Sequence, residues 1–347
     1  MATRRTQALY RPQELAFRTQ YAELKERSRS AGLLLPGAPG SLALREGTGY
    51  GYWYRRYYLL PGQEIEDLVC KAGEDDVLEE MRQRIDFSAW SWQQVRSLRA
   101  LGFQVADKDV ACVLVELHNK GLFSGGMVVV GTLAFMAMLN EFGAIAVSPR
   151  TQDVDLARRQ ALKLAAPVSF LKTLEGTRLK FFAVPGMPNQ TPSTSVKRPG
   201  KEGLRVDVLT PGGVLGQAVP VPELQWHAQA VPQYDYLLQE PQQAAVLAGG
   251  HCIPVSLPQP ERFAWHKLFS SAKRVNEPEK AKKDLVQAAT LLALLAEQDD
   301  VVLAESFKAA PAKVRSAAKA RLPVLRGLLQ AHPQTLEQVE RALARTR

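Results

Sequence analysis

The sequence has only three cysteines among its 347 residues, Cys70, Cys112 and Cys252, and they lie far apart. No C-x-x-C pair is present, which argues against a zinc site or a disulfide framework and favours a reducing, cytoplasmic compartment. Long apolar runs are also missing. The longest, residues 127–139, is interrupted by a glycine and a threonine and is too short to span a bilayer. We therefore expect no membrane partner.

Acidic residues are outnumbered by basic ones, with 35 Asp and Glu against 44 Lys and Arg and a net charge of +9. This balance favours an acidic partner such as nucleic acid or a nucleotide, but it does not identify one. Apolar residues make up 46% of the chain and charged residues 23%, which is typical of a globular protein. The length is sufficient for two or three compact units.

The N-terminal part is expected to hold helices and a hairpin. Residues 9–31 are charged and end at Gly32, which predicts a helix. Residues 41–60 hold two strand-like runs around a Gly/Thr-rich turn, which predicts a hairpin, and two helices should follow at about 63–85 and 88–101. The run "YGYWYRRYY" in the hairpin either stacks on nucleic acid bases or buries half of its rings against neighbouring helices.

The central part alternates between strand and helix patterns. The run "MVVVG" predicts a short buried strand, "TLAFMAMLNEFG" a helix that stops at Gly143, and "RTQDVDLA" a second strand. Residues 177–186 and 204–213 predict two more strands. This order predicts an α+β protein with a small mixed β-sheet flanked by helices.

The C-terminal part becomes helical after an irregular stretch. Residues 222–260 are rich in proline and show few regular signals, whereas apolar periodicity from residue 261 onward predicts helices. We therefore place the domain boundaries at 1–105 for the helix and hairpin region, 106–225 for the central domain and 226–347 for a mainly helical C-terminal domain.

Two aspartates interrupt the strand "RTQDVDLA". Because side chains alternate between the faces of a strand, Asp153 and Asp155 share one face, while Val154 and Leu156 take the other. Two ionised carboxylates this close raise each other's pKa unless positive charge lies between them. A divalent cation such as Mg²⁺ meets this need, because it takes oxygen ligands from carboxylates and substrate phosphates.

A third carboxylate follows the same logic. In "LRVDVLT", Asp207 is the one acid on the exposed face of a strand whose other face is apolar. If this strand lies beside that of Asp153 and Asp155, the three carboxylates converge at one edge of the sheet. They could then hold two metal ions for an in-line displacement at phosphorus.

A phosphate-binding turn is predicted upstream. In "VVVGTLAF" a strand runs through Gly131 and Thr132 into a helix. A glycine lets the backbone approach a phosphate closely, and the helix start offers free N–H groups and the positive end of the helix dipole. Thr132 is placed to cap the helix or to bond a phosphate oxygen.

These segments, together with "WHKL" in "ERFAWHKLFSSAKR", resemble the polymerase-β-like nucleotidyltransferase superfamily. The subgroup that looks most similar consists of bacterial nucleotidyltransferase-fold proteins related to AbiEii-type toxins of abortive-infection systems. The resemblance covers roughly residues 125–295. The turn differs from the usual superfamily pattern, because it has Gly-Thr in place of Gly-Gly or Gly-Ser.

The resemblance implies roles for individual residues. Asp153, Asp155 and Asp207 would be the catalytic metal ligands, for two Mg²⁺ ions or Mn²⁺ in their place, and Asp207 would help to deprotonate the acceptor. The residues implied in binding the nucleoside triphosphate (NTP) are Gly131, Thr132, Lys267, Lys273 and Arg274.

The resemblance also implies an activity and its partners. It implies an enzyme that transfers a nucleoside monophosphate from an NTP substrate to an acceptor hydroxyl. The basic charge favours RNA as acceptor, for example a tRNA end, and the toxin relatives imply a role in toxicity or anti-phage defence with an antitoxin protein. The alternatives are transfer to protein or small molecules, template-independent polymerisation of nucleotides, and a catalytically inactive interaction module on the same fold.

Overall fold

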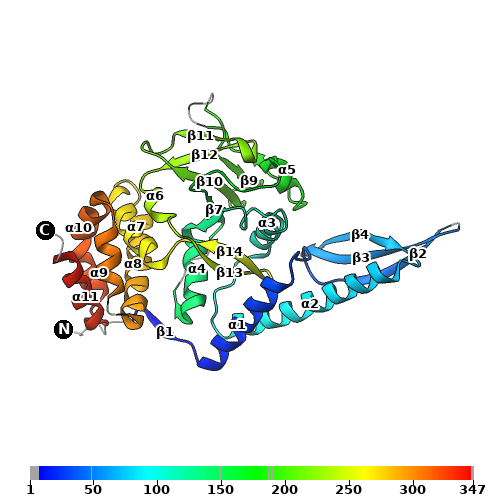
Figure 1. Cartoon of the computed structure of the whole chain (residues 1–347), viewed down its shortest axis with the longest axis horizontal. Helices are drawn as coiled ribbons and strands as arrows, with labels where there is room; N and C mark the ends of the chain where they lie inside the picture. The colour runs from blue at the N-terminus through cyan, green and yellow to red at the C-terminus, as the bar shows by residue number, and fades with distance from the viewer. Residues whose placement is uncertain are drawn as a thin grey trace.

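The computed structural model describes residues 8–47, 49–147, 151–186, 188, 191–299 and 301–344. It shows an α+β protein with a mixed sheet near its centre (Figure 1). A three-stranded sheet and a long helix extend to one side, and a group of helices formed by the C-terminal part lies on the other (Figure 1). The predicted fold class and the helical C-terminal region are confirmed.

The extension on one side is an antiparallel sheet covered by a helix. Its strands are β2 (Ser41–Glu46), β3 (Gly51–Leu60) and β4 (Gln63–Lys71), in the order β2-β3-β4, and the helix is α2 (Asp75–Ala100). The expected hairpin is β2–β3. The helix expected from residue 63 was wrong, because residues 63–71 pair with β3 and a single helix follows. The acidic residues there favour helix locally, but pairing with the neighbouring strand decides the conformation.

The aromatic run on β3 divides between the two faces of this sheet. Arg55 is buried and donates hydrogen bonds to the carbonyl oxygens of Pro36, Ala38 and Pro39. Tyr57 is buried beside it, whereas Tyr52, Arg56 and Tyr58 are exposed. Among the rings of the run only Tyr57 is buried, and Trp53 and Tyr54 are partly buried, so the packing alternative holds for part of the run and leaves the other tyrosines exposed.

The N-terminal helix is shorter than expected. Residues Tyr10–Pro12 form β1, which pairs antiparallel with β6 (Ala144–Ala146), and the helix α1 covers Leu15–Ser30. The expected start at residue 9 was therefore wrong. Pro12 has no backbone N–H for a helix, and the chain adds an edge strand before the helix begins.

The central sheet is mixed and carries the predicted acidic strands. Its main order is β11-β12-β10-β7-β5, with β7 and β12 parallel to β10 and β5 antiparallel to β7. Two short strands, β8 and β9, continue from the β10 side. The bounds are Val128–Val130 (β5), Asp153–Ala157 (β7), Phe182–Ala183 (β8), Ser195–Lys197 (β9), Arg205–Pro211 (β10), Ala218–Val221 (β11) and Trp226–Val231 (β12).

Helices from the central part pack against this sheet. They are α3 (Lys108–Asn119), α4 (Gly131–Phe142) and the short α5 (Phe170–Glu175). Helix α4 is buried along almost its whole length and ends at Gly143 in the left-handed conformation, with φ of 62°. The expected strand and helix on either side of Gly131 are confirmed.

The stretch 222–260, expected to be irregular, is largely structured. It contains a short 3-10 turn (Pro222–Leu224), strand β12, helix α6 (Tyr234–Leu237) and an antiparallel hairpin of β13 (Gln242–Ala248) and β14 (His251–Leu257). Most hairpin residues are buried. Strands buried on both faces lack the apolar–polar alternation that reveals half-buried strands, so the sequence pattern missed them.

The remaining chain forms the helical group. Its helices are α7 (Pro260–Lys273), α8 (Pro278–Gln298), α9 (Val302–Ala309), α10 (Ala312–Leu328) and α11 (Pro333–Ala344). Helices α7 and α8 pack closely and lie next to α6 and the central sheet (Figure 1). None of the described helices is long and apolar enough to cross a membrane.

Candidate functional site

The central sheet brings the three predicted aspartates together. Strands β7 and β10 are parallel neighbours, and their register sets Asp207 directly opposite Asp155 and Arg205 opposite Asp153. Neighbouring strands lie about 4.8 Å apart, so Asp155 and Asp207 attach to the backbone at nearly the same point of the sheet. Val154 and Leu156 are buried on the other face, which leaves the three carboxylates on one side.

The turn before α4 touches this acidic cluster. Val130 pairs with Asp155 across β5 and β7, and Gly131 follows with φ of +67°. A Cβ atom built on Gly131 would lie 1.9 Å from Oδ2 of Asp155. The carboxylate therefore occupies the space that any other residue at position 131 would fill. Glycine is required both for the backbone conformation and for this contact.

Replacing Gly131 with alanine is expected to disrupt this junction. The methyl group collides with Asp155, and the left-handed conformation adds strain, so we expect a loss of at least about 2 kcal/mol of unfolding free energy. Gly213→Ala is the control, because no atom lies within 4 Å of its added Cβ. Chemical denaturation of both variants measures the difference. Equal stability of the two would contradict the contact.

Asp155 carries the strongest electrostatic perturbation in the cluster. Burial raises its pKa to about 6, and the neighbouring charges of Asp207 and Asp153 act in the same direction. The ammonium groups of Lys267 and Lys283 oppose this rise. The fold therefore disfavours the ionised form of Asp155.

Asp207 has a basic partner on its own strand. Nε of Arg205 lies 2.8 Å from Oδ1 of Asp207, and Nη2 of Arg205 donates a hydrogen bond of 2.7 Å to Oγ of Ser195. The sequence argument identified Asp207 as the one acid on this face but did not pair it with Arg205. The i, i+2 spacing of Arg205 and Asp207 was the signal that could have identified the pair.

The donor set suits a cation that arrives with substrate. Within the described ranges, no three His, Cys, Asp or Glu side chains are gathered closely enough to hold an ion by themselves. Asp155 and Asp207 nevertheless offer carboxylate oxygen donors at paired positions of β7 and β10. Since Mg²⁺ commonly binds one or two carboxylates together with substrate phosphates, these residues fit that mode of binding.

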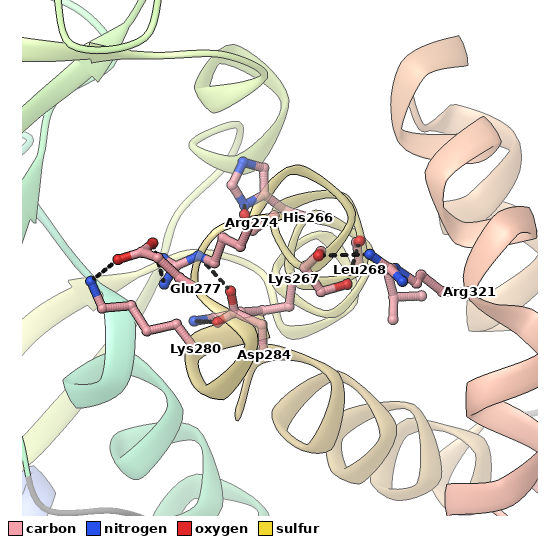
Figure 2. Close-up of polar contacts among 10 residues, drawn as sticks. His266, Lys267, Leu268, Arg274, Glu277, Lys280, Asp284 and Arg321 are labelled. Carbon is pink, nitrogen blue, oxygen red and sulfur yellow. Dashed lines mark hydrogen bonds and ion pairs between the residues drawn. The ribbon is translucent and has the colours of Figure 1, made fainter. Parts of the chain in front are cut away.

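Basic residues approach the cluster from α7 and α8. Nζ of Lys267 lies 2.7 Å from Oδ1 of Asp284, and Nε of Arg274 lies 3.1 Å from Oδ2 (Figure 2). The Asp284 side chain is only 3% exposed. One buried carboxylate thus fixes the positions of two predicted nucleotide-binding residues. Sequence reasoning missed Asp284, although an acid at the edge of an apolar helix face is an unusual feature.

Lys283 is a second residue that the sequence argument missed. It is half-buried on α8, and its pKa is lowered by burial and by the charge of Lys267, while Asp284, Asp155 and Asp153 act to raise it. The influence of Asp153 and Asp155 places its ammonium group near the acidic cluster. Two lysines, from α7 and α8, therefore lie near enough to the aspartates to affect their charge.

The other predicted nucleotide-binding residues differ in exposure. Thr132 is buried within the first turn of α4. Lys273 is exposed, and its Nζ lies 5.9 Å from the centre of the Phe269 ring. The roles assigned to these residues stay predictions.

A family comparison complements this geometry. A family model described as Nucleotidyltransferase matches residues 108–312, which is more than half of the chain. The chain belongs to this nucleotidyltransferase family. The matched range contains the acidic strands, the Gly131 turn and the basic residues of α7 and α8.

Other comparisons of this chain add little detail. The crystal structure of an antigenic nucleotidyltransferase-like protein from Paracoccidioides brasiliensis is similar at 16% sequence identity and a TM-score of 0.37, over 67% of this chain and 91% of that chain. At this TM-score the geometry of one protein says nothing about the other. No match to a curated protein was found.

His266 has a packing role. Its ring is buried between the rings of Tyr234 and Phe269, and burial lowers its pKa to about 4. Its ring nitrogens lie near the Pro232 carbonyl and the Ser270 hydroxyl. It is therefore uncharged at neutral pH and supports the α6–α7 contact.

Acid is expected to destabilise the fold through His266. Between the ordinary pKa of 6.5 and the folded value of about 4, the unfolded chain binds more protons than the folded one. Stability is therefore complete above pH 6.5 and falls toward pH 4, by on the order of 2–3 kcal/mol. Urea denaturation at several pH values in this range measures how the free energy of unfolding changes with pH, and this pH dependence should be weaker in His266→Gln. The control His227→Gln, on β12, should show the pH dependence of the wild type. An unchanged pH dependence in His266→Gln would show that His266 is not its cause.

Proposed function

We propose that the protein transfers a nucleoside monophosphate from an NTP to an acceptor hydroxyl and releases pyrophosphate. The observation that carries this proposal is the register of Asp155 and Asp207, side by side at the Gly131 turn, in a chain of the nucleotidyltransferase family. Carboxylates, a helix start and lysines around one point are the groups that phosphoryl transfer requires for positioning and charge neutralisation.

The chemistry is a displacement at the α-phosphorus. The acceptor oxygen forms a bond to this phosphorus, the bond to the pyrophosphate oxygen breaks, and the acceptor proton passes to a carboxylate, for which we propose Asp207. Two Mg²⁺ ions, or Mn²⁺, bound with the substrate by Asp153, Asp155 and Asp207, would neutralise the phosphate charge.

The remaining groups bind the triphosphate. Helix α4 begins at Gly131 and Thr132, beside the acidic cluster. Its free backbone N–H groups at this end favour binding of an anion such as a phosphate. Lys267 and Lys283 supply positive charge for the phosphates, which the aspartates cannot provide. Asp284 holds Arg274 beside these lysines. Lys273 remains a proposed phosphate contact on the exposed end of α7.

The proposed acceptor is RNA, for example a tRNA end, because the net charge of +9 favours a polyanion. Kinship with AbiEii-type toxins, a toxin or anti-phage role and an antitoxin partner are proposed on the sequence resemblance alone. A cytoplasmic location is proposed from the scarcity of cysteine, and all three cysteines are buried and unpaired.

The decisive experiment uses each NTP labelled at the α-phosphate, with Mg²⁺ or Mn²⁺. The protein is incubated with total RNA, with a protein extract, or without acceptor. Label on RNA supports the proposal. Label on protein would show that the acceptor is a protein, and long labelled products without acceptor would show polymerisation of nucleotides. No label in any sample would favour an inactive binding module. Asp235→Asn, an exposed aspartate on α6, is the matched control for variants in the acidic cluster.

A further inference from the structure

A separate cavity lies on the N-terminal side of the molecule, away from the acidic cluster. It has a volume of about 660 Å³ and is formed by α1, the segment after it, α2 and the first residues of β14. None of the aspartates, lysines or glycines of the candidate site lines it. Its volume falls in the range of small-molecule sites, roughly 300–1,000 Å³.

The wall of this cavity is largely apolar. Leu34, Leu35 and Phe87 line it, and the buried residues His251 and Cys252 lie at the same cavity. Burial lowers the pKa of His251 to about 4, so its ring is neutral. Glu26, Arg27 and Glu80 also line the cavity, so the uncharged surface for the body of a ligand is the part formed by the leucines and Phe87.

A buried hydroxyl group in the wall lacks a partner. Ser88 on α2 is 6% exposed and lines the cavity, and its Oγ makes no hydrogen bond with any described residue. A buried polar atom left unsatisfied is costly, and native structures rarely leave one without a reason. A polar group on a bound molecule would satisfy it.

A half-buried arginine stands one helical turn before this serine. Arg84 lines the cavity, and no ion pair or hydrogen bond of its side chain is found among the described residues. The buried Arg55 is close enough that the charge of Arg84 helps burial to lower its pKa to about 10. Two guanidinium groups near a cavity wall, one of them without a counterion, favour an anion there.

We propose that this cavity binds a small molecule with an apolar, ring-containing body and one anionic group. The anionic group would pair with Arg84, the body would lie against Phe87 and Leu35, and a polar atom would bond Ser88. Since the cavity shares no residue with the acidic cluster, this molecule is distinct from the nucleotide substrate, and its binding stands whether or not the protein transfers nucleotides.

The test uses the fluorescent aromatic sulfonate 1-anilinonaphthalene-8-sulfonate and its uncharged analogue N-phenyl-1-naphthylamine, titrated calorimetrically into the full chain. For the sulfonate, Arg84→Gln should weaken binding about tenfold or more, because a charge-assisted contact is lost. Ser88→Leu should weaken binding of both probes, because the larger side chain projects into the cavity and removes the hydroxyl group. Arg82→Gln, an exposed arginine on the same helix, should change neither.

The two probes make the outcome unambiguous. Arg84→Gln should leave binding of the uncharged analogue unchanged. The proposal is overturned if the sulfonate binds Arg84→Gln as tightly as the wild type, or if both probes weaken equally. Circular dichroism checks the fold of each variant, and Arg84→Gln keeps the test decisive if Ser88→Leu does not fold.

Discussion

Asp155→Asn is expected to lower the rate of nucleotidyl transfer by about 10³-fold, as the loss of about 4 kcal/mol of charge stabilisation implies. The carboxylate of Asp155 lies against the Gly131 turn, and Asp155 pairs with Asp207 across the strands, so its removal affects phosphate positioning and cation binding together. Initial rates with saturating labelled NTP measure the effect. Asp235→Asn should retain the wild-type rate, and retention of that rate by Asp155→Asn would contradict the assignment.

The same variant is expected to be more stable than the wild type without divalent cations. The folded pKa of Asp155, about 6, exceeds its ordinary 3.8, so the wild type loses stability as the pH rises through this interval. Above it, asparagine removes a buried, repelled charge, which we expect to add roughly 1–3 kcal/mol. Melting curves in a chelator near neutral pH should show the gain. Added Mg²⁺ should stabilise the wild type more than the variant.

Asp284→Asn is expected to destabilise the protein and weaken NTP binding at once. Asp284 is buried and neutralises both Lys267 and Arg274, so its loss leaves Lys267 without its counterion and Arg274 with only the exposed Glu277, at a cost of about 3 kcal/mol. The ammonium group of Lys267 is then free to move, and KM for NTP should rise more than kcat falls. Denaturation and steady-state kinetics measure the two effects.

Two controls separate packing from substrate binding in this network. Glu277→Gln removes the exposed partner of Arg274, which lies 3.9 Å away, and should cost less than about 0.5 kcal/mol. The double change Lys267→Met with Asp284→Leu should recover part of the stability without recovering NTP binding. Recovery of both would show that Lys267 acts only in packing.

The acidic part of the site was predictable because strand periodicity is strict. Alternation in "RTQDVDLA" fixed which side chains share a face, and the burial of Val154 and Leu156 agrees with it. The turn at Gly131 was recognisable because a strand, a glycine and a helix follow one another directly. Both signals are local, so one segment of sequence contains them.

The basic part was less predictable because it depends on pairing between helices. Asp284 forms ion pairs with Lys267 and Arg274, which come from α7 and its C-terminal end. The sequence of α8 alone contains no pattern that indicates these partners. The same holds for Lys283, whose position near Asp155 follows from how α8 packs. The hairpin of β13 and β14 was missed for a related reason, since burial on both faces removes the alternation that marks a strand.

Strand β10 is clamped on both sides at the position of Asp207, which pairs with Asp155 of β7 and with Ser195 of β9. A strand held this way has little freedom to shift when a larger or smaller molecule arrives. Adaptation to different substrates must therefore come from the long side chains of α7 and α8, which reach the same point from a separate layer. A mutational search for altered nucleotide preference should begin on those helices and leave the sheet untouched.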